Sequence, residues 1–204
     1  DAQVTSVIGD ELLRRNFPMI HAVGRAAAAA PRLIELVHGE ADAPKVTVIG
    51  KGVCFDSGGL DTKNADGMRI MKKDMGGAAS ALGLAEIVMG EKLRVRLRVL
   101  IPAVENAISG NAFRPGDILP TRKGLTVEIA NTDAEGRLIL ADALALGAED
   151  SPQMLITLAT LTGAARTALG PDLAPFYCTD EALSADIAKA AEATSDPVWR
   201  MPLW

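Results

Sequence analysis

Hydrophobic positions along the chain fall into short runs separated by polar segments, and their spacing predicts strands that alternate with helices. Apolar and β-branched runs predict strands over residues 32–38, 46–49, 97–104, 125–130 and 154–161. Helical spacing with good helix-forming residues predicts helices over residues 76–93, 138–148, 165–169 and 182–193. This alternation is typical of an α/β fold, here a layered sandwich with a largely parallel, mixed β-sheet flanked by helices.

Two polar segments follow predicted strands, and both are candidates for a functional site. Residues 50–74 are rich in Gly, Asp and Lys and come directly after the strand predicted at 46–49. Residues 131–137 come directly after the strand predicted at 125–130. Ligands of open α/β sheets bind beyond the carboxyl ends of the strands, and long polar loops are usually functional. We therefore expect both segments at one edge of the sheet.

The second segment reads Asn-Thr-Asp-Ala-Glu-Gly-Arg-Leu and places Asp133, Glu135 and Arg137 at alternate positions. In an extended chain, alternate side chains share a face, so this pattern predicts two carboxylates and a guanidinium side by side. Carboxylates packed together repel unless a cation neutralises them, and a pair of divalent metals is a known hydrolytic arrangement. The first segment adds further candidates, which are Lys51, Asp56, Lys63 and Asp74.

Other interpretations of these residues remain open from the pattern alone. Asp and Lys among glycines are common in solvated turns, and a single Asp-x-Glu-x-Arg also arises by chance. The run from Gly50 to Gly52 lacks the full spacing of a phosphate-binding P-loop. His21 and His38 are far apart and form no HExxH motif, which excludes a helix-borne histidine zinc site. Ser57 has no plausible base beside it in the sequence, so a serine triad has little support.

Composition narrows the class of protein further. The 204 residues carry 21 Lys and Arg against 26 Asp and Glu, a net charge of −5, which gives no support for general nucleic-acid binding. There is no apolar run of membrane-spanning length. The two cysteines, Cys54 and Cys178, are interpreted as reduced thiols of a cytoplasmic protein. The missing initiator Met and the apolar end suggest a piece of a longer protein.

Three ordered blocks together resemble the leucyl aminopeptidase family, the cytosolic aminopeptidases of the M17 peptidase type. The blocks are GKGVCFDSGGLDTK at 50–63, MKKDMGGAA at 71–79 and NTDAEGRL at 131–138, and the resemblance extends over about residues 4–204. It implies a two-metal-dependent aminopeptidase that releases N-terminal, Leu-like residues from peptide substrates. It also implies that residues 1–204 are part of the catalytic domain, without the N-terminal domain and the C-terminal end of the catalytic domain. The full-length protein is expected to be a homo-hexamer.

The resemblance also assigns roles to individual residues. The implied metal ligands are Lys51, Asp56, Asp74, Asp133 and Glu135. They would hold two divalent ions, manganese or zinc first, with magnesium or cobalt as alternatives. The resemblance implies that Lys63 stabilises the oxyanion and that Arg137 holds a bicarbonate acting as general base toward the attacking water. The implied substrate pocket, whose apolar and small residues suit an uncharged side chain, consists of Met71, Thr160 and Gly163.

One departure and two alternatives accompany this interpretation. Asn64 stands where the family often has Pro, which removes no ligand. The alternatives are a DNA-binding or architectural protein on the same fold, or an inactive fragment. Duplex binding that survives chelation, without peptidase activity, would favour the first alternative, although the acidic charge opposes it.

Overall fold

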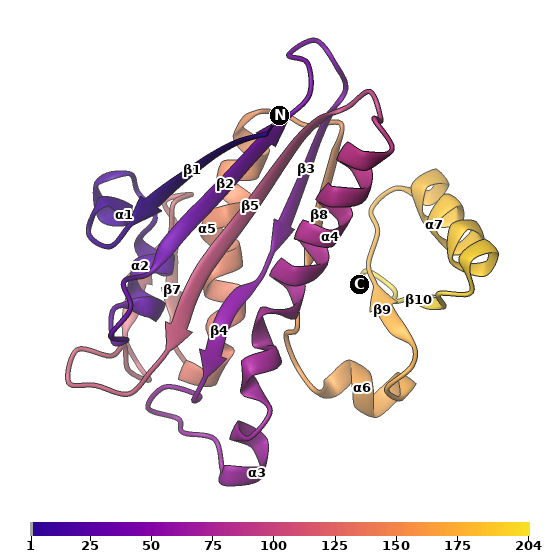
Figure 1. Ribbon diagram of the computed structural model, residues 1–204. Helices are drawn as coiled ribbons and strands as arrows, with labels where there is room; N and C mark the ends of the chain where they lie inside the picture. The colour runs from indigo at the N-terminus through magenta and orange to yellow at the C-terminus, as the bar shows by residue number, and fades with distance from the viewer. Residues whose placement is uncertain (1) are drawn as a thin grey trace. The chain divides into compact units, whose positions relative to one another are not determined.

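The computed structural model describes residues 2–204, and the chain divides into two units, Asp1–Leu161 and Thr162–Trp204. The first unit contains a six-stranded mixed sheet in the order β1-β2-β5-β3-β8, with β4 paired to β5 (Figure 1). The central strands β5 (Arg96–Asn106), β3 (Lys45–Gly50) and β8 (Met154–Leu158) run parallel, and β4 (Gly52–Asp56) pairs parallel to the far end of β5.

The other edge of this sheet is antiparallel. Strand β1 (Gln3–Ile8) pairs antiparallel with β2 (Arg32–His38), and β2 pairs antiparallel with β5. A separate two-stranded hairpin is formed by β6 (Ile118–Pro120) and β7 (Thr126–Glu128). The α/β layered fold and its mixed, largely parallel sheet are therefore confirmed.

Helices cover both faces of the central strands because these strands are apolar on both sides (Figure 1). Ile49 and Leu100 pack toward one face, in a core with α1 (Glu11–Arg14), α2 (Pro18–Gly24) and α5 (Glu135–Glu149). Val48 and Val99 pack toward the opposite face, against three buried alanines of α4 (Gly76–Gly90), which are Ala78, Ala81 and Ala85. The small side chains of α4 let its backbone approach the sheet closely.

Short elements complete the first unit and lie near the ends of the parallel strands. They are α3 (Ala65–Met68) and two 3₁₀ turns, η1 (Met71–Met75) and η2 (Thr132–Ala134). The second unit contains α6 (Ala164–Leu169), β9 (Ala174–Phe176), α7 (Glu181–Thr194) and β10 (Val198–Arg200), with β9 and β10 parallel. Among residues 2–204, the structure has no helix that is both long and apolar enough to cross a membrane.

The predicted elements at 32–38, 46–49, 76–93, 97–104, 165–169 and 182–193 are confirmed within a few residues. The strand predicted at 154–161 is shorter and ends at Leu158. The long polar loop expected at 50–74 is not loop throughout, because it contains β4, α3 and η1. The strand predicted at 125–130 exists as β7, but it belongs to the small hairpin and not to the central sheet.

The extended conformation expected for 131–137 is also wrong. After Asn131 the chain forms the 3₁₀ turn η2 and then enters α5 at Glu135, three residues before the predicted start of that helix. Residues two apart on a helix point about 200° apart, so Glu135 and Arg137 lie on opposite sides of α5. Glu135 is buried and Arg137 is exposed.

Candidate metal centre

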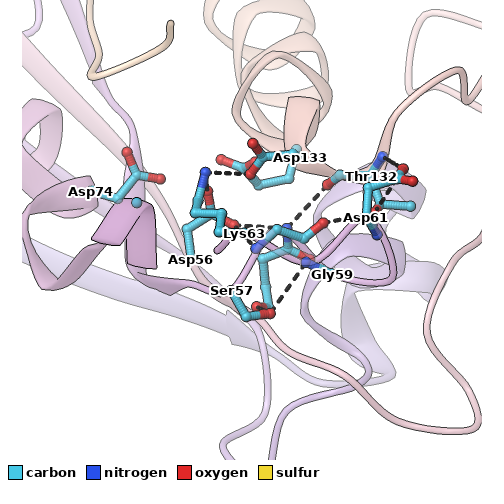
Figure 2. Close-up of polar contacts among 12 residues, drawn as sticks. Asp56, Ser57, Gly59, Asp61, Lys63, Asp74, Thr132 and Asp133 are labelled. Atoms are coloured by element: carbon cyan, nitrogen blue, oxygen red, sulfur yellow. Dashed lines mark hydrogen bonds and ion pairs between the residues drawn. The ribbon is translucent and has the colours of Figure 1, made fainter. Parts of the chain in front are cut away.

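Six charged side chains converge at the carboxyl end of the parallel strands, and we call them the carboxylate cluster. Lys51 follows β3, Asp56 ends β4, and Lys63 lies in the loop beyond β4. Asp74 lies in η1, Asp133 in η2, and Glu135 is the first residue of α5. The sequence-predicted carboxylates and lysines are thus brought together, at the edge where open α/β sheets bind ligands. Figure 2 shows Asp56, Lys63, Asp74 and Asp133 from this cluster.

Lys51 lies at the buried side of the cluster, with 1% of its surface exposed. Its Nζ lies 2.7 Å from Asp74 Oδ2 and 2.9 Å from Glu135 Oε1, and it donates a hydrogen bond of 2.6 Å to the carbonyl of Thr160. A Cβ on Gly136 would lie 2.7 Å from Lys51 Cε and 2.8 Å from its Nζ. The first turn of α5 therefore needs glycine at this position for Lys51 to reach both carboxylates.

Lys63 lies at the more open side of the cluster, in contact with the other two carboxylates. Its Nζ donates a hydrogen bond to Asp133 Oδ1 and lies 3.1 Å from Asp56 Oδ2 (Figure 2). Its side chain is 16% exposed and that of Asp133 is 31% exposed. Solvent therefore reaches the cluster at Lys63 and Asp133, and not at Lys51.

A hydrogen-bonded clamp fastens the loop after β4 to η2. Asp61 Oδ2 accepts the N–H of Thr132 at 2.7 Å, and Thr132 Oγ1 accepts the N–H of Asp61 at 2.8 Å (Figure 2). The Thr132 hydroxyl donates to the carbonyl of Gly58 at 2.6 Å. Asn131 accepts the N–H of Asp133 at 2.7 Å and so starts the 3₁₀ turn. These contacts hold Asp133 opposite Lys63.

The charges of the cluster do not balance. Asp56, Asp74, Asp133 and Glu135 carry −4 when ionised, and Lys51 and Lys63 carry +2, which leaves −2. Burial raises the pKa of Glu135 to about 7, and the neighbouring Asp56 and Asp74 add to that rise against the opposing effect of Lys51. Burial likewise raises the pKa of Asp133, against the lowering effect of Lys63. The site therefore lacks positive charge.

Lys63 shows the reverse effect. Burial lowers the pKa of its ammonium, but hydrogen bonds to Asp133 and Asp56 outweigh the burial and raise the pKa above its usual value. Lys63 is consequently a protonated donor beside two carboxylates.

The donor atoms fit divalent metal ions. Asp56, Asp133 and Glu135 each offer one carboxylate oxygen, and these three oxygens lie within 4.8 Å of one another. Asp74 Oδ2 is buried and accepts no hydrogen bond from the described residues, although Lys51 Nζ lies 2.7 Å away as its ion pair. A buried cluster of carboxylates with net charge −2 is what bound cations would neutralise.

The other residues predicted for the site differ in their relation to the carboxylate cluster. Met71 is partly buried at the first position of η1, three residues before Asp74. Thr160 donates a hydrogen bond of 2.7 Å to Asp74 Oδ1, so it contacts a candidate metal ligand directly. Arg137 is exposed on α5. Gly163 lies before α6 in the second unit, outside the unit that carries the cluster.

Sequence reasoning missed three residues that organise the site, namely Asp61, Asn106 and Thr132. Asn106 donates from Nδ2 to Asp56 Oδ1 at 2.9 Å and to the carbonyl of Thr132 at 3.0 Å. One signal was available for Asn106, because a polar residue two positions after the predicted strand 97–104 is expected at the same sheet edge as Lys51.

Comparison with protein-family models finds one family over the full chain. The model described as "Cytosol aminopeptidase family, catalytic domain" matches residues 1–204. Peptidase B of Pectobacterium carotovorum is 43% identical over 199 residues, which is 96% of this chain and 46% of that protein. A probable cytosol aminopeptidase of Rhodopirellula baltica is 44% identical over 207 residues, covering 100% of this chain and 41% of that protein.

Solved structures agree with this match. A cytosol aminopeptidase from Coxiella burnetii superposes with a TM-score of 0.96 at 54% identity, covering 100% of this chain and 44% of that chain. A leucyl aminopeptidase from Trypanosoma brucei in complex with bestatin has a TM-score of 0.94 at 36% identity, with 100% and 40% coverage. The chain thus spans less than half the length of these relatives.

Proposed function

Because the chain belongs to the cytosol aminopeptidase family and carries its catalytic-domain sequence, we propose that the protein containing it is a two-metal-dependent aminopeptidase. It releases N-terminal residues, with a preference for Leu-like side chains, from peptides. The observation that carries this proposal is the buried carboxylate cluster, whose four acids exceed its two lysines at the carboxyl end of the sheet.

Metal dependence belongs to the family, and the ligand set is part of the proposal. We assign two divalent ions, manganese or zinc, with magnesium or cobalt as alternatives, to Lys51, Asp56, Asp74, Asp133 and Glu135. Oxygen ligands with one amine accept all four metals. Such ions, when bound, supply a water of lowered pKa and polarise the scissile carbonyl.

Lys63 is proposed to act as the donor that stabilises the developing oxyanion. Its raised pKa supports this role, because an oxyanion donor has to remain protonated at neutral pH. Its side chain is also the lysine of the cluster on the solvent-accessible side, where a substrate arrives. Arg137 is proposed to hold a bicarbonate, and its exposure on α5 leaves the guanidinium free to bind an anion from solvent.

The substrate pocket is proposed to include Met71, Thr160 and Gly163. The partly buried Met71 supports an apolar pocket, and Thr160 joins that pocket to Asp74 through its hydroxyl. The solved relatives include leucyl aminopeptidases in complex with actinonin and with bestatin, so the same fold binds small ligands in those proteins.

The remaining proposals concern the whole protein. We propose that residues 1–204 are part of a catalytic domain, and that the full-length protein also contains an N-terminal domain and the rest of the catalytic domain. It is proposed to assemble as a homo-hexamer and to act in the cytoplasm, since several relatives are named cytosol aminopeptidases.

The direct test uses the full-length protein that contains this chain. We expect it to hydrolyse leucine p-nitroanilide, to lose this activity on dialysis against a chelator, and to regain it when Mn²⁺ or Zn²⁺ is added. A substrate with a blocked amine serves as the matched control and is expected to remain uncleaved. Activity that persists after complete metal removal would refute the two-metal proposal.

A further inference from the structure

Asn106, the last residue of β5, is buried at the contact between the two segments that carry the carboxylates. Only 1% of its surface is exposed. Its carbonyl accepts hydrogen bonds from the N–H of Ser57 at 3.1 Å and from the Ser57 hydroxyl at 2.7 Å. Its side-chain amide reaches Asp56 Oδ1 and the carbonyl of Thr132. Asn106 therefore joins the end of β4 to η2.

The orientation of this amide follows from its partners. Asp56 Oδ1 and the Thr132 carbonyl are both acceptors, so the nitrogen of the amide has to face them. The amide oxygen then has no hydrogen-bond partner among the described residues. A buried oxygen without a hydrogen-bond partner is destabilising, so this arrangement is a poor solution for stability alone. It is the arrangement expected when two donors are required at fixed positions.

The Asn106 amide orients the carboxylate of Asp56. Its Oδ1 accepts from Asn106 Nδ2 at 2.9 Å and from the N–H of Gly58 at 2.8 Å. Its Oδ2 faces the cluster and lies 3.1 Å from Lys63 Nζ. The carboxylate thus has one oxygen held by neutral donors and the other turned toward the site.

The same amide acts on the neighbouring segment. By holding the carbonyl of Thr132, Asn106 fixes the residue directly before Asp133. Asp56 and Asp133 are two of the three carboxylates whose oxygens lie within 4.8 Å of one another. One side chain therefore sets the spacing between two candidate ligands that are far apart in the sequence.

We propose that Asn106 is a positioning residue of the metal centre, which presents Asp56 to the metals through Oδ2 and sets the distance from Asp56 to Asp133. This inference rests on the proposed function, because it concerns the metals of that site. Asn106 lies behind Asp56 and does not itself contact metal or substrate. Groups that orient metal ligands in this way typically change metal affinity by about 10–100-fold when they are removed.

The test compares metal binding by four forms of the full-length protein: unmodified, Asn106→Ala, Asn106→Thr and Asn111→Ala. Each is stripped with a chelator and titrated with Mn²⁺ by calorimetry, and kcat and KM are then measured with leucine p-nitroanilide. Thr fills nearly the same space as Asn but has a single O–H, so it can serve only one of the two acceptors. Asn111→Ala is the matched control, since the Asn111 amide donates to the carbonyl of Arg25 and accepts from the Ser109 hydroxyl, and neither partner belongs to the carboxylate cluster.

We expect Asn106→Ala to weaken the Kd for Mn²⁺ by about 10–100-fold and to lower kcat, with KM within about twofold of the unmodified value. Asn106→Thr is expected to fall between Ala and the unmodified protein, and it keeps the question answerable if Asn106→Ala does not fold. Asn111→Ala should leave the Kd unchanged. Folded Asn106 variants with an unchanged Kd would overturn this inference and leave the proposed function intact. An unmodified protein that binds no divalent ion would overturn both.

Discussion

The two ends of strand β3 lie beside two clusters of charged residues that differ in how their charge is balanced. Beyond its last residue lies the carboxylate cluster around Lys51. Beside its first residue, Lys45, lies a second group that we call the arginine cluster, which consists of Glu35, Lys45, Arg96, Arg98 and Asp150. In the arginine cluster Arg98 pairs with Glu35 at 2.6 Å and with Asp150 at 2.7 Å.

The difference lies in charge and solvent access. The arginine cluster has three cations and two anions, so its carboxylates are neutralised within the protein. The side chains of Glu35 and Asp150 are 30% and 56% exposed, and water screens what remains. The carboxylate cluster has four acids against two lysines, and its acids Asp56, Asp74 and Glu135 are almost fully buried. Only the carboxylate cluster therefore requires a cation from outside the protein.

The largest expected effect comes from removing one acid at each end of β3. We expect Glu135→Ala to reduce peptidase activity to background and to weaken metal binding by more than the roughly 100-fold typical of groups that only orient ligands. Glu35→Ala is the matched variant and should leave kcat and metal content within about twofold, because its partner Arg98 is not part of the site. Metal content and rates of leucine p-nitroanilide hydrolysis decide between them. Equal losses in both variants would show that the clusters are not functionally distinct.

Replacing one lysine in each cluster separates the catalytic step from metal binding. Lys63→Ala is expected to lower kcat by about 100-fold, the loss typical of one oxyanion donor, while the two metals are retained. Lys45→Ala removes a lysine from the arginine cluster, where its Nζ donates to the carbonyl of Asp150. It should leave kcat unchanged. Loss of metal from Lys63→Ala would contradict its role as a donor and make it part of the metal-holding set.

The central sheet could be predicted because its main strands are rich in apolar and β-branched residues. Residues 97–104 are buried on both faces, and 32–38 lack glycine and proline, so both strands were readable from spacing. Strand β4 was missed because it has only five residues, begins with glycine and leaves Cys54 exposed. Its pairing with β5 beyond the end of β3 is a tertiary contact that no local pattern encodes.

The site could be predicted only in part, because some of its residues act through tertiary contacts. The residue types at Lys51, Asp56, Asp133 and Glu135 were informative, and the family resemblance supplied their roles. The expected extended chain at 131–137 was wrong, because Asn131 caps a 3₁₀ turn that leads into α5. Asp61 and Asn106 both act by contacting Thr132, which is 71 residues away from Asp61 and 26 residues away from Asn106 in the chain. Such contacts form only after folding, so even where the position of Asn106 after a predicted strand is suggestive, local spacing does not reveal its partners.

A smaller effect is expected from pH, and it arises only at the carboxylate cluster. Metals bind the ionised carboxylate, and the pKa of Glu135 is raised to about 7 by burial, so protons compete below that value. We expect Glu135 to add up to about tenfold to the apparent Kd for Mn²⁺ per pH unit below 7, and nothing well above it. Titrations between pH 5.5 and 8.5 measure this, with Glu35→Gln as the control that keeps the same slope.

In the metal-free protein, raising the pH has the opposite effect: it lowers folding stability, whereas it strengthens metal binding. The folded pKa of Glu135 lies above its ordinary value of 4.5, so folding favours the protonated acid. Its contribution to stability is present below about pH 4.5 and is lost as pH rises through about 7. Chelator-treated protein should therefore unfold at lower denaturant at pH 8 than at pH 6, and added metal should remove this difference. A metal-free protein that is more stable at pH 8 would contradict the raised pKa.

The smallest effect is expected at the arginine cluster, and it concerns stability alone. Arg98→Ala leaves Glu35 and Asp150 without their guanidinium partner, but both acids reach solvent. We expect the free energy of unfolding to fall by about 1–2 kcal/mol, as for partly exposed charged hydrogen bonds. Urea midpoints of the metal-loaded protein measure this loss, and Arg98→Lys, which keeps the charge but not the paired geometry, should recover part of it. The Kd for Mn²⁺ should not change, because Arg98 touches no candidate ligand. If Arg98→Ala weakened metal binding as strongly as it lowered stability, the central sheet would transmit strain from one cluster to the other, and the two clusters would have to be treated as one coupled site.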